Sequence, residues 1–241
     1  MNKEWSELNK TMQSLLKKKD TYLQGFETLF DLRNNLMDTI NSFKQKLTTN
    51  DFSAIPFINA AGYHSKTIAY SLWHIFRIED IVAHTLIKGD EQLFFKNGYQ
   101  SRIGSKIITT GNELVKQEIA DFSQDLDLNQ LYAYLVDVKN STEEIIGNLA
   151  YNDLKTKISD ERKNALKALK VVSENENAIW LVDFWCDKNI GGLIQMPFSR
   201  HWIMHIEACL RIANKIAQNP TTSGSTKTER DFWVAKFSER E

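Results

Sequence analysis

The chain has 241 residues, of which 42% are hydrophobic, and its 30 basic residues nearly balance its 31 acidic ones. This length and apolar content suffice for one sizeable hydrophobic core. A net charge near zero gives no overall field that favours nucleic acid or a membrane surface, and we expect neither as a partner. Ten glycines and three prolines are few helix breakers, so the composition favours a mostly helical protein.

The first residues of the chain and its cysteines indicate in which cellular compartment the protein is expected. Residues 1–4 (MNKE) are polar, and no apolar run approaches the roughly 20 residues that a membrane span requires. We therefore expect a cytoplasmic protein. The two cysteines, Cys186 and Cys209, lack CxxC spacing and are too few for a disulfide scaffold. They are expected to be small buried hydrophobic residues.

The first helical segment spans residues 5–47. Its apolar residues recur in alternating steps of three and four, which predicts one very long helix or two nearly collinear ones with a break near Asp20. Arg33 falls on the apolar seam in mid-helix and needs an acidic partner there. We also expect a homodimer through this long segment. Residues 48–63 are expected to form a crossing loop.

The second helix is predicted over residues 65–88, because a Gly-Asp stop signal follows it. His74 lies at the margin of its apolar arc, and Glu79 lies in the middle of that arc, where an unpaired carboxylate is costly. We therefore expect Glu79 either to meet Arg33 or to turn towards a metal site as a supporting group. His84 lies on the polar side and is expected at the surface.

The rest of the chain also shows mainly helical spacing after an irregular, aromatic-bearing stretch at 89–112. On the third main helix, Glu143 and Glu144 are expected to be solvated. A glycine pair, Gly191 and Gly192, is expected to form a hinge or tight turn. The predicted helices are a short one at 113–122, the third main helix at 128–149, further helices at 159–172 and 179–188, and the fourth main helix from Pro197.

These elements define the expected domain organisation. Residues 1–218 are expected to form a single helical domain. A polar linker and a short aromatic tail follow over 219–241. The tail residues Phe232, Trp233 and Phe237 are expected to dock on the domain or on another protomer.

Two histidines stand four residues apart at the start of the fourth main helix. A helix places His201 and His205 one turn apart at the margin of the buried face, a position that matches that of His74 on the second helix. Such positions suit metal ligands, and equally suit packed, hydrogen-bonded histidines. The residues between the pair are Trp-Ile-Met, so the glutamate of a zinc-protease HExxH motif is missing. If the second and fourth helices are neighbours, three neutral imidazoles converge on one divalent ion and leave a coordination position open.

Three segments together resemble the DinB/YfiT-like superfamily, in the branch of DinB-like domain 2. They are SLWHIFRIED at 71–80, TTGNEL at 109–114 and MPFSRHWIMH at 196–205. The resemblance covers roughly residues 20–215. Its specific feature is the combination of the first motif, which contains WH and ED, with the late HxxxH. One departure is Glu207, because relatives often have glycine after the second histidine.

The resemblance implies a four-helix bundle with a long, partly helical connection between the third and fourth main helices. It also implies a divalent metal, most often nickel or zinc, on His74, His201 and His205. Characterised relatives are thiol-dependent transferases and isomerases that act with bacillithiol, mycothiol or glutathione, and many members have no known activity. A small-molecule thiol or electrophile is therefore the expected partner.

Two functional hypotheses follow. The first is a metal-dependent enzyme of the thiol-transferase or hydrolase type, in which the ion activates a thiol or water and Glu79 or Asp80 supports the ligands. No GxSxG elbow or P-loop lysine offers a competing centre, and the sequence identifies no further catalytic residue. The alternative is a non-catalytic helical stress or interaction protein in which the histidines are structural or bind metal without turnover.

Overall fold

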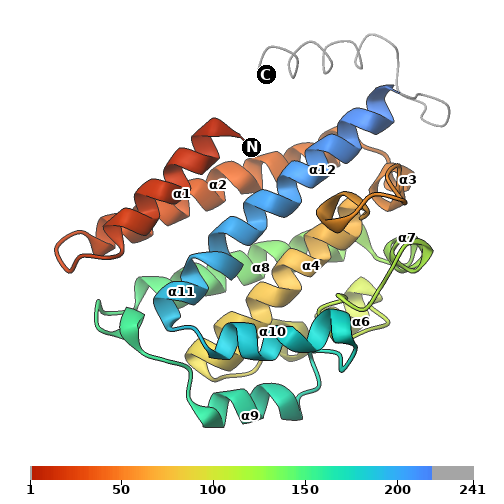
Figure 1. Cartoon of the computed structure of the whole chain (residues 1–241). Helices are drawn as coiled ribbons and strands as arrows, with labels where there is room; N and C mark the ends of the chain where they lie inside the picture. Colours follow the sequence, from red (N-terminus) through yellow and green to blue (C-terminus); the bar gives the residue numbers. More distant parts are fainter. Residues whose placement is uncertain (1, 219–241) are drawn as a thin grey trace.

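In the computed structural model, residues 2–218 are described, and they fold into helices and connecting turns (Figure 1). No β-strand occurs in this part of the chain, as the composition predicted. None of its helices combines the length and apolarity needed to cross a membrane. The expected aromatic tail at 232–237 lies outside the described residues.

Four long helices pack side by side and form the body of the protein (Figure 1). The helices at 68–80 and 201–218 follow the predicted second and fourth main helices closely. Helix α4 contacts α8 and α12, and α2 contacts the same two helices, so each long helix has two long neighbours. The four are α2 (Tyr22–Lys46), α4 (Ile68–Asp80), α8 (Leu128–Gly147) and α12 (His201–Gln218).

Two of the long helices are extended by π-helical turns. Helix α4 continues through Ile81–Lys88 and ends at Gly89, whose left-handed conformation (φ 78°) confirms the predicted stop signal. Helix α12 is preceded by the turn Met196–Arg200, with Pro197 near its beginning, where the missing N–H of proline costs nothing.

The first segment is a helical hairpin, and the expectation of one long helix or two collinear helices was wrong. Helix α1 (Lys3–Leu15) packs back against α2 through a tight turn (Figure 1). Gly25 permits this contact, because a Cβ atom there would lie 2.8 Å from the side chain of Leu16. Trp5 and Met12 are buried within the chain by this hairpin. The apolar seam that we assigned to a homodimer is therefore largely used within one chain.

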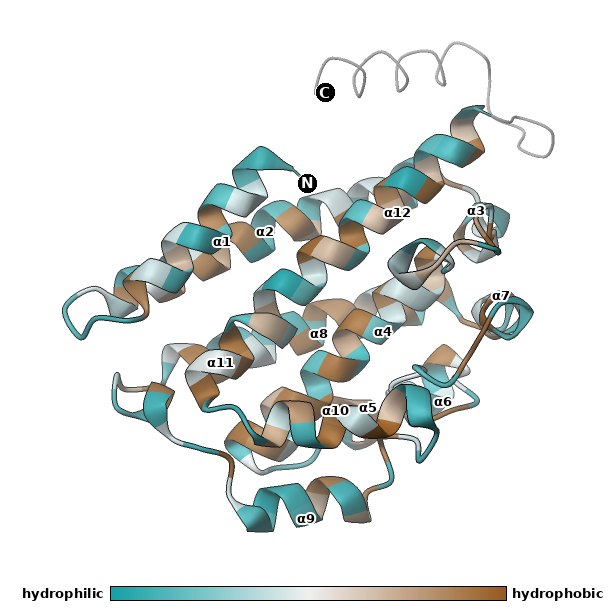
Figure 2. Cartoon of the chain, in the orientation of Figure 1, coloured by the Kyte–Doolittle hydropathy of each residue, from teal (hydrophilic) through white to brown (hydrophobic). Residues whose placement is uncertain are grey.

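Short helices form the connections between the long ones. Between α8 and α12 the connection is long and partly helical, as expected, and the hydrophilic α9 lies at its outer edge (Figure 2). The short elements are α3 (Thr49–Ser53), Gly62–His64, α5 (Leu93–Lys96), α6 (Tyr99–Ile103), α7 (Gln117–Gln124), Asp153–Lys155, α9 (Asp160–Ala168), α10 (Glu176–Cys186) and α11 (Ile190–Ile194).

The glycine pair near the end of this connection is helical and is not a hinge. Gly191 and Gly192 lie inside α11. A Cβ atom at Gly191 would lie 3.0 Å from the carbonyl oxygen of Leu154, so the first glycine serves close packing. Cys186 and Cys209 are buried and unbridged, which confirms their expected role as small hydrophobic residues.

One buried ion pair joins all four long helices. Arg33 on α2 donates to both carboxylate oxygens of Glu79 on α4, at 2.7 and 3.0 Å, and to Glu143 on α8 at 2.9 Å. It also donates to the carbonyl of Phe198 at 3.1 Å, and its guanidinium lies 4.3 Å from the ring centre of Trp202 on α12. The indole N–H of Trp202 donates to Glu79 at 2.8 Å. The expected pairing of Arg33 with Glu79 is thus confirmed.

The electrostatics of Arg33 favour the charged guanidinium. Burial alone lowers the pKa of Arg33, but Glu79 and Glu143 outweigh burial and raise it. The expectation that Glu143 is solvated was wrong, because this carboxylate also accepts from Lys139 at 2.9 Å and is held against Arg33. Glu144, one residue later, is exposed as expected.

The substitution Arg33→Met is expected to lower the free energy of unfolding by about 3–5 kcal/mol, because it leaves Glu79 buried without its cation. Urea denaturation at neutral pH measures the loss. The double variant Arg33→Met, Glu79→Met should recover a large part of it, since no uncompensated charge then remains. Arg102→Met, at an exposed arginine, is the control. A loss below about 1 kcal/mol for Arg33→Met contradicts the prediction.

Candidate metal centre

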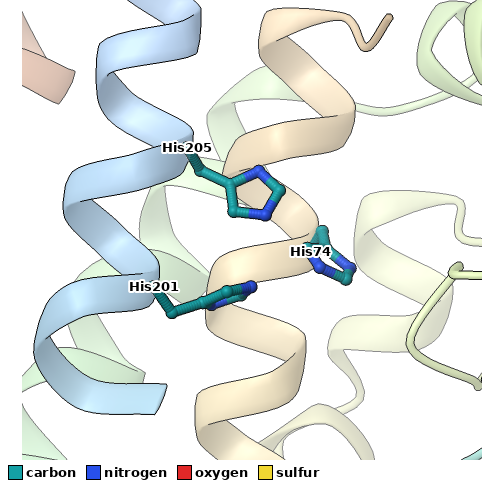
Figure 3. Close-up of side chains that lie close together, drawn as sticks. All are labelled: His74, His201 and His205. Carbon is teal, nitrogen blue, oxygen red and sulfur yellow. The ribbon is translucent and has the colours of Figure 1, made fainter. Parts of the chain in front are cut away.

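Three histidine side chains from two neighbouring helices point towards one another (Figure 3). His74 lies in the middle of α4, and His201 and His205 occupy the first two turns of α12. All three are buried, with 3%, 7% and 2% of their surface exposed. The ring centres lie 5.1, 4.9 and 4.6 Å apart, and one nitrogen from each ring lies within 4.8 Å of the other two. The sequence predicted this convergence on the condition that the second and fourth helices are neighbours, and α4 and α12 are in contact.

The packing of α12 against α4 explains this convergence. The i, i+4 spacing puts His201 and His205 on one side of α12. Between them, Trp202 turns to another side, where it packs 4.4 Å from the ring of Phe76 and is hydrogen-bonded to Glu79. Because Trp202 is fixed on α4, the rotation of α12 about its own axis is fixed as well. Both histidines are thereby directed towards His74.

The loop before α7 orients the ring of His74. The backbone carbonyl of Thr110 lies 2.6 Å from Nδ1 of His74, and a carbonyl only accepts, so Nδ1 carries the proton. The lone pair of Nε2 is then free to bind a metal ion. Tyr70 stacks on a face of the same ring, with the ring centres 5.3 Å apart, and its hydroxyl donates to the carbonyl of Gly111 at 2.9 Å. Such carbonyl–histidine bonds are a common support for metal ligands.

Burial keeps the three imidazoles neutral. It lowers the pKa of His74 to about 4, and it lowers the pKa values of His201 and His205 well below the usual value, with a further contribution from the neighbouring histidines. Neutral imidazole is the form that binds metal ions. At neutral pH all three rings are therefore in the ligand form.

Unpaired ring nitrogens show that a cation fits the cluster. Nδ1 of His201 and both nitrogens of His205 are buried and have no hydrogen-bond partner within residues 2–218. Each buried unpaired polar atom costs about 1–3 kcal/mol. A divalent ion would use one lone pair from each ring, and three nitrogen ligands suit zinc or nickel. The cluster can thus hold a metal ion, whose identity the geometry leaves open.

The carboxylates that we expected near the ligands are engaged elsewhere. Glu79 is bound by Arg33 and Trp202, so it contacts the residue that follows His201 and no histidine of the cluster. Asp80 points to another part of the core, where it accepts from the backbone N–H groups of residues 93 and 94 and from a tyrosine hydroxyl. The supporting group that the structure provides for His74 is the carbonyl of Thr110, which our reading of the sequence missed.

His84 is buried, and its expected surface position was wrong. Only 2% of its surface is exposed. Nδ1 lies 2.6 Å from a carboxylate oxygen of Asp90, and Nε2 lies 3.1 Å from the hydroxyl of Ser141 on α8. Every residue of α4 is buried, including Arg77 and Asp80, which lie on the same side of the helix as His84. This side is therefore covered by other elements, among them α8. His84 is not part of the three-histidine cluster.

Comparison with known proteins adds no assignment. The sequence matches no protein-family model, and no curated protein matches it.

The stability of the metal-free protein should fall as the pH falls from 6.5 towards 4. His74 is neutral in both states above pH 6.5, but between 6.5 and about 4 only the unfolded chain binds its proton. From pH 7 to pH 5 this histidine alone removes about 2 kcal/mol of unfolding free energy. Urea denaturation in chelator at both pH values measures the change. His74→Ala should show a correspondingly smaller decrease, and equal decreases in the two proteins would contradict the expectation.

Proposed function

We propose that the chain is a member of the DinB/YfiT-like superfamily and that its four long helices form the four-helix bundle of that superfamily. In this proposal it is a divalent-metal-dependent enzyme of the thiol-transferase or hydrolase type. His74, His201 and His205 hold the ion, nickel or zinc, and the substrate is a low-molecular-weight thiol or an electrophile. The observation that carries the proposal is the convergence of three buried, neutral imidazoles, of which His201 and His205 have unpaired ring nitrogens.

The residues of the chain have separate tasks in this mechanism. A divalent ion on three neutral nitrogen ligands supplies Lewis acidity, which lowers the pKa of a thiol or of water. Thr110 keeps the proton of His74 on Nδ1 and so presents Nε2 to the centre. Tyr70 holds the ring plane by stacking. Burial of the cluster excludes bulk water and strengthens the electrostatic interactions inside.

Elemental analysis tests the ligand set. After exchange out of chelating buffers, or after reconstitution, the protein should carry about one equivalent of a divalent ion, and His74→Ala, His201→Ala and His205→Ala should each lose it. His64→Ala is the matched control, because this histidine pairs with Arg211 outside the cluster. Metal content that survives His74→Ala would contradict the three-histidine site. No metal after reconstitution would favour the non-catalytic alternative.

The loop that supports His74 can be tested at Gly111. This glycine has φ 76°, and a Cβ atom would lie 2.8 Å from the indole of Trp73, so Gly111→Ala must shift the loop and the neighbouring carbonyl of Thr110. We expect metal affinity to fall about 10–100-fold, measured by competition with a chromophoric chelator. Gly98→Ala is the matched control, because Gly98 has φ 65° and open space around its Cα. Equal affinities in the two variants would contradict the role of the loop.

A further inference from the structure

A lysine stands in line with His74. Lys66 lies two residues before α4, just outside the helix, and Tyr70 and His74 stand one turn apart on α4 itself. The ammonium nitrogen of Lys66 lies 5.0 Å from the ring centre of Tyr70. That ring is nearly parallel to the ring of His74, with an angle of 12° between the two planes. The ring of Tyr70 therefore lies between the ammonium group of Lys66 and the proposed metal ligand His74.

The ammonium group of Lys66 has no anionic partner within residues 2–218. Lys66 is half-buried, and burial lowers its pKa. Its ammonium group lies over the aromatic ring of Tyr70, and none of the ion pairs formed in the described part of the chain includes Lys66. Glu113 also acts on Tyr70. One of its oxygens accepts from the hydroxyl of Thr109, and the other is buried without a hydrogen-bond partner within residues 2–218. Glu113 forms no ion pair with Lys66 in this part of the chain. Within residues 2–218, this half-buried cation thus has no ion-pair partner.

The positive charge of Lys66 acts electrostatically on two histidines of the cluster. It lowers the pKa of His74 and that of His205, in each case after the larger effect of burial. His205 is covered on this side by Tyr63, whose ring meets it edge-on at 4.7 Å. A further positive charge, Arg200, acts on Tyr63. Lys66 and Arg200 thus contribute positive charge near Tyr70 and Tyr63, and Glu113 contributes a negative charge near Tyr70.

The charges of Lys66 and of a bound divalent ion indicate which kind of ligand the ion would take. A divalent ion on three neutral histidines would add two positive charges near an ammonium group that has no ion-pair partner within residues 2–218, and such charges repel in a partly desolvated site. An anionic ligand that reaches both the ion and Lys66 removes this repulsion. We propose that Lys66 is a specificity-determining residue that binds a carboxylate of the substrate, so that the enzyme acts on small thiols that carry a carboxylate. This inference rests on the proposed function.

Spectroscopic titration of the cobalt-loaded protein tests the proposal without a catalytic assay. The probes are 3-mercaptopropionate, which carries a carboxylate, and 2-mercaptoethanol, which is neutral. The visible bands of cobalt report thiolate binding to the ion. We expect 3-mercaptopropionate to bind about tenfold more tightly than 2-mercaptoethanol, and Lys66→Met to abolish this preference. Lys66→Arg should retain the preference, and Lys10→Met, at an exposed lysine on α1, should leave it unchanged.

The possible outcomes separate this inference from the proposed function. Equal binding of the two thiols to the parent protein, or a preference that survives Lys66→Met, overturns the role of Lys66 and leaves the metal centre intact. If neither thiol alters the spectrum, the proposed thiol-dependent function is overturned. The role of Lys66 is then tested by titrating the cobalt-loaded protein with acetate. Acetate binding that weakens about tenfold in Lys66→Met supports the anion site, and unchanged or absent binding overturns it. Failure of the protein to bind cobalt overturns both proposals.

Discussion

The buried ion pair of Arg33 and Glu79 is the interaction on which the arrangement of the four long helices depends. Its hydrogen bonds reach α2, α4 and α8 and the turn before α12. Hydrophobic packing alone permits helices to slide and rotate with modest changes in free energy, whereas a guanidinium fork fits its carboxylate in one geometry. A buried pair adds little net stability relative to apolar residues of the same size. Its value here is the register that it imposes, above all on α12 through Trp202.

The three-histidine cluster is a consequence of that register. With the indole of Trp202 held by Glu79, the preceding and following turns of α12 direct His201 and His205 at His74. The loop carbonyl at Thr110 completes the orientation on the side of α4. Desolvation then keeps all three rings neutral and leaves nitrogens unpaired. A chain that accepts these costs in its core has a centre suited to a cation. The role that we propose for Lys66 is to favour anionic ligands of that cation.

Much of this arrangement was predictable because it follows from local spacing. Apolar periodicity gave the long helices, and a charge in the middle of an apolar arc on each of two helices gave the Arg33–Glu79 pair. The hairpin of α1 and α2 was missed because its turn, unlike most, contains no glycine or proline. His84 was misplaced because apolar periodicity predicts one buried face for this helix, whereas other elements cover it on every side. Support from a backbone carbonyl, as at Thr110, leaves no side-chain signal in the sequence.

The most direct test of the metal centre is the anomalous scattering of crystals grown from protein reconstituted with zinc or nickel. Data collected on both sides of the absorption edge of the metal locate the ion without assumptions about its ligands. The account predicts one strong peak about 2.0–2.1 Å from a nitrogen of each of His74, His201 and His205. A peak elsewhere, for example between His84 and Asp90, or no peak in fully reconstituted protein, would contradict it.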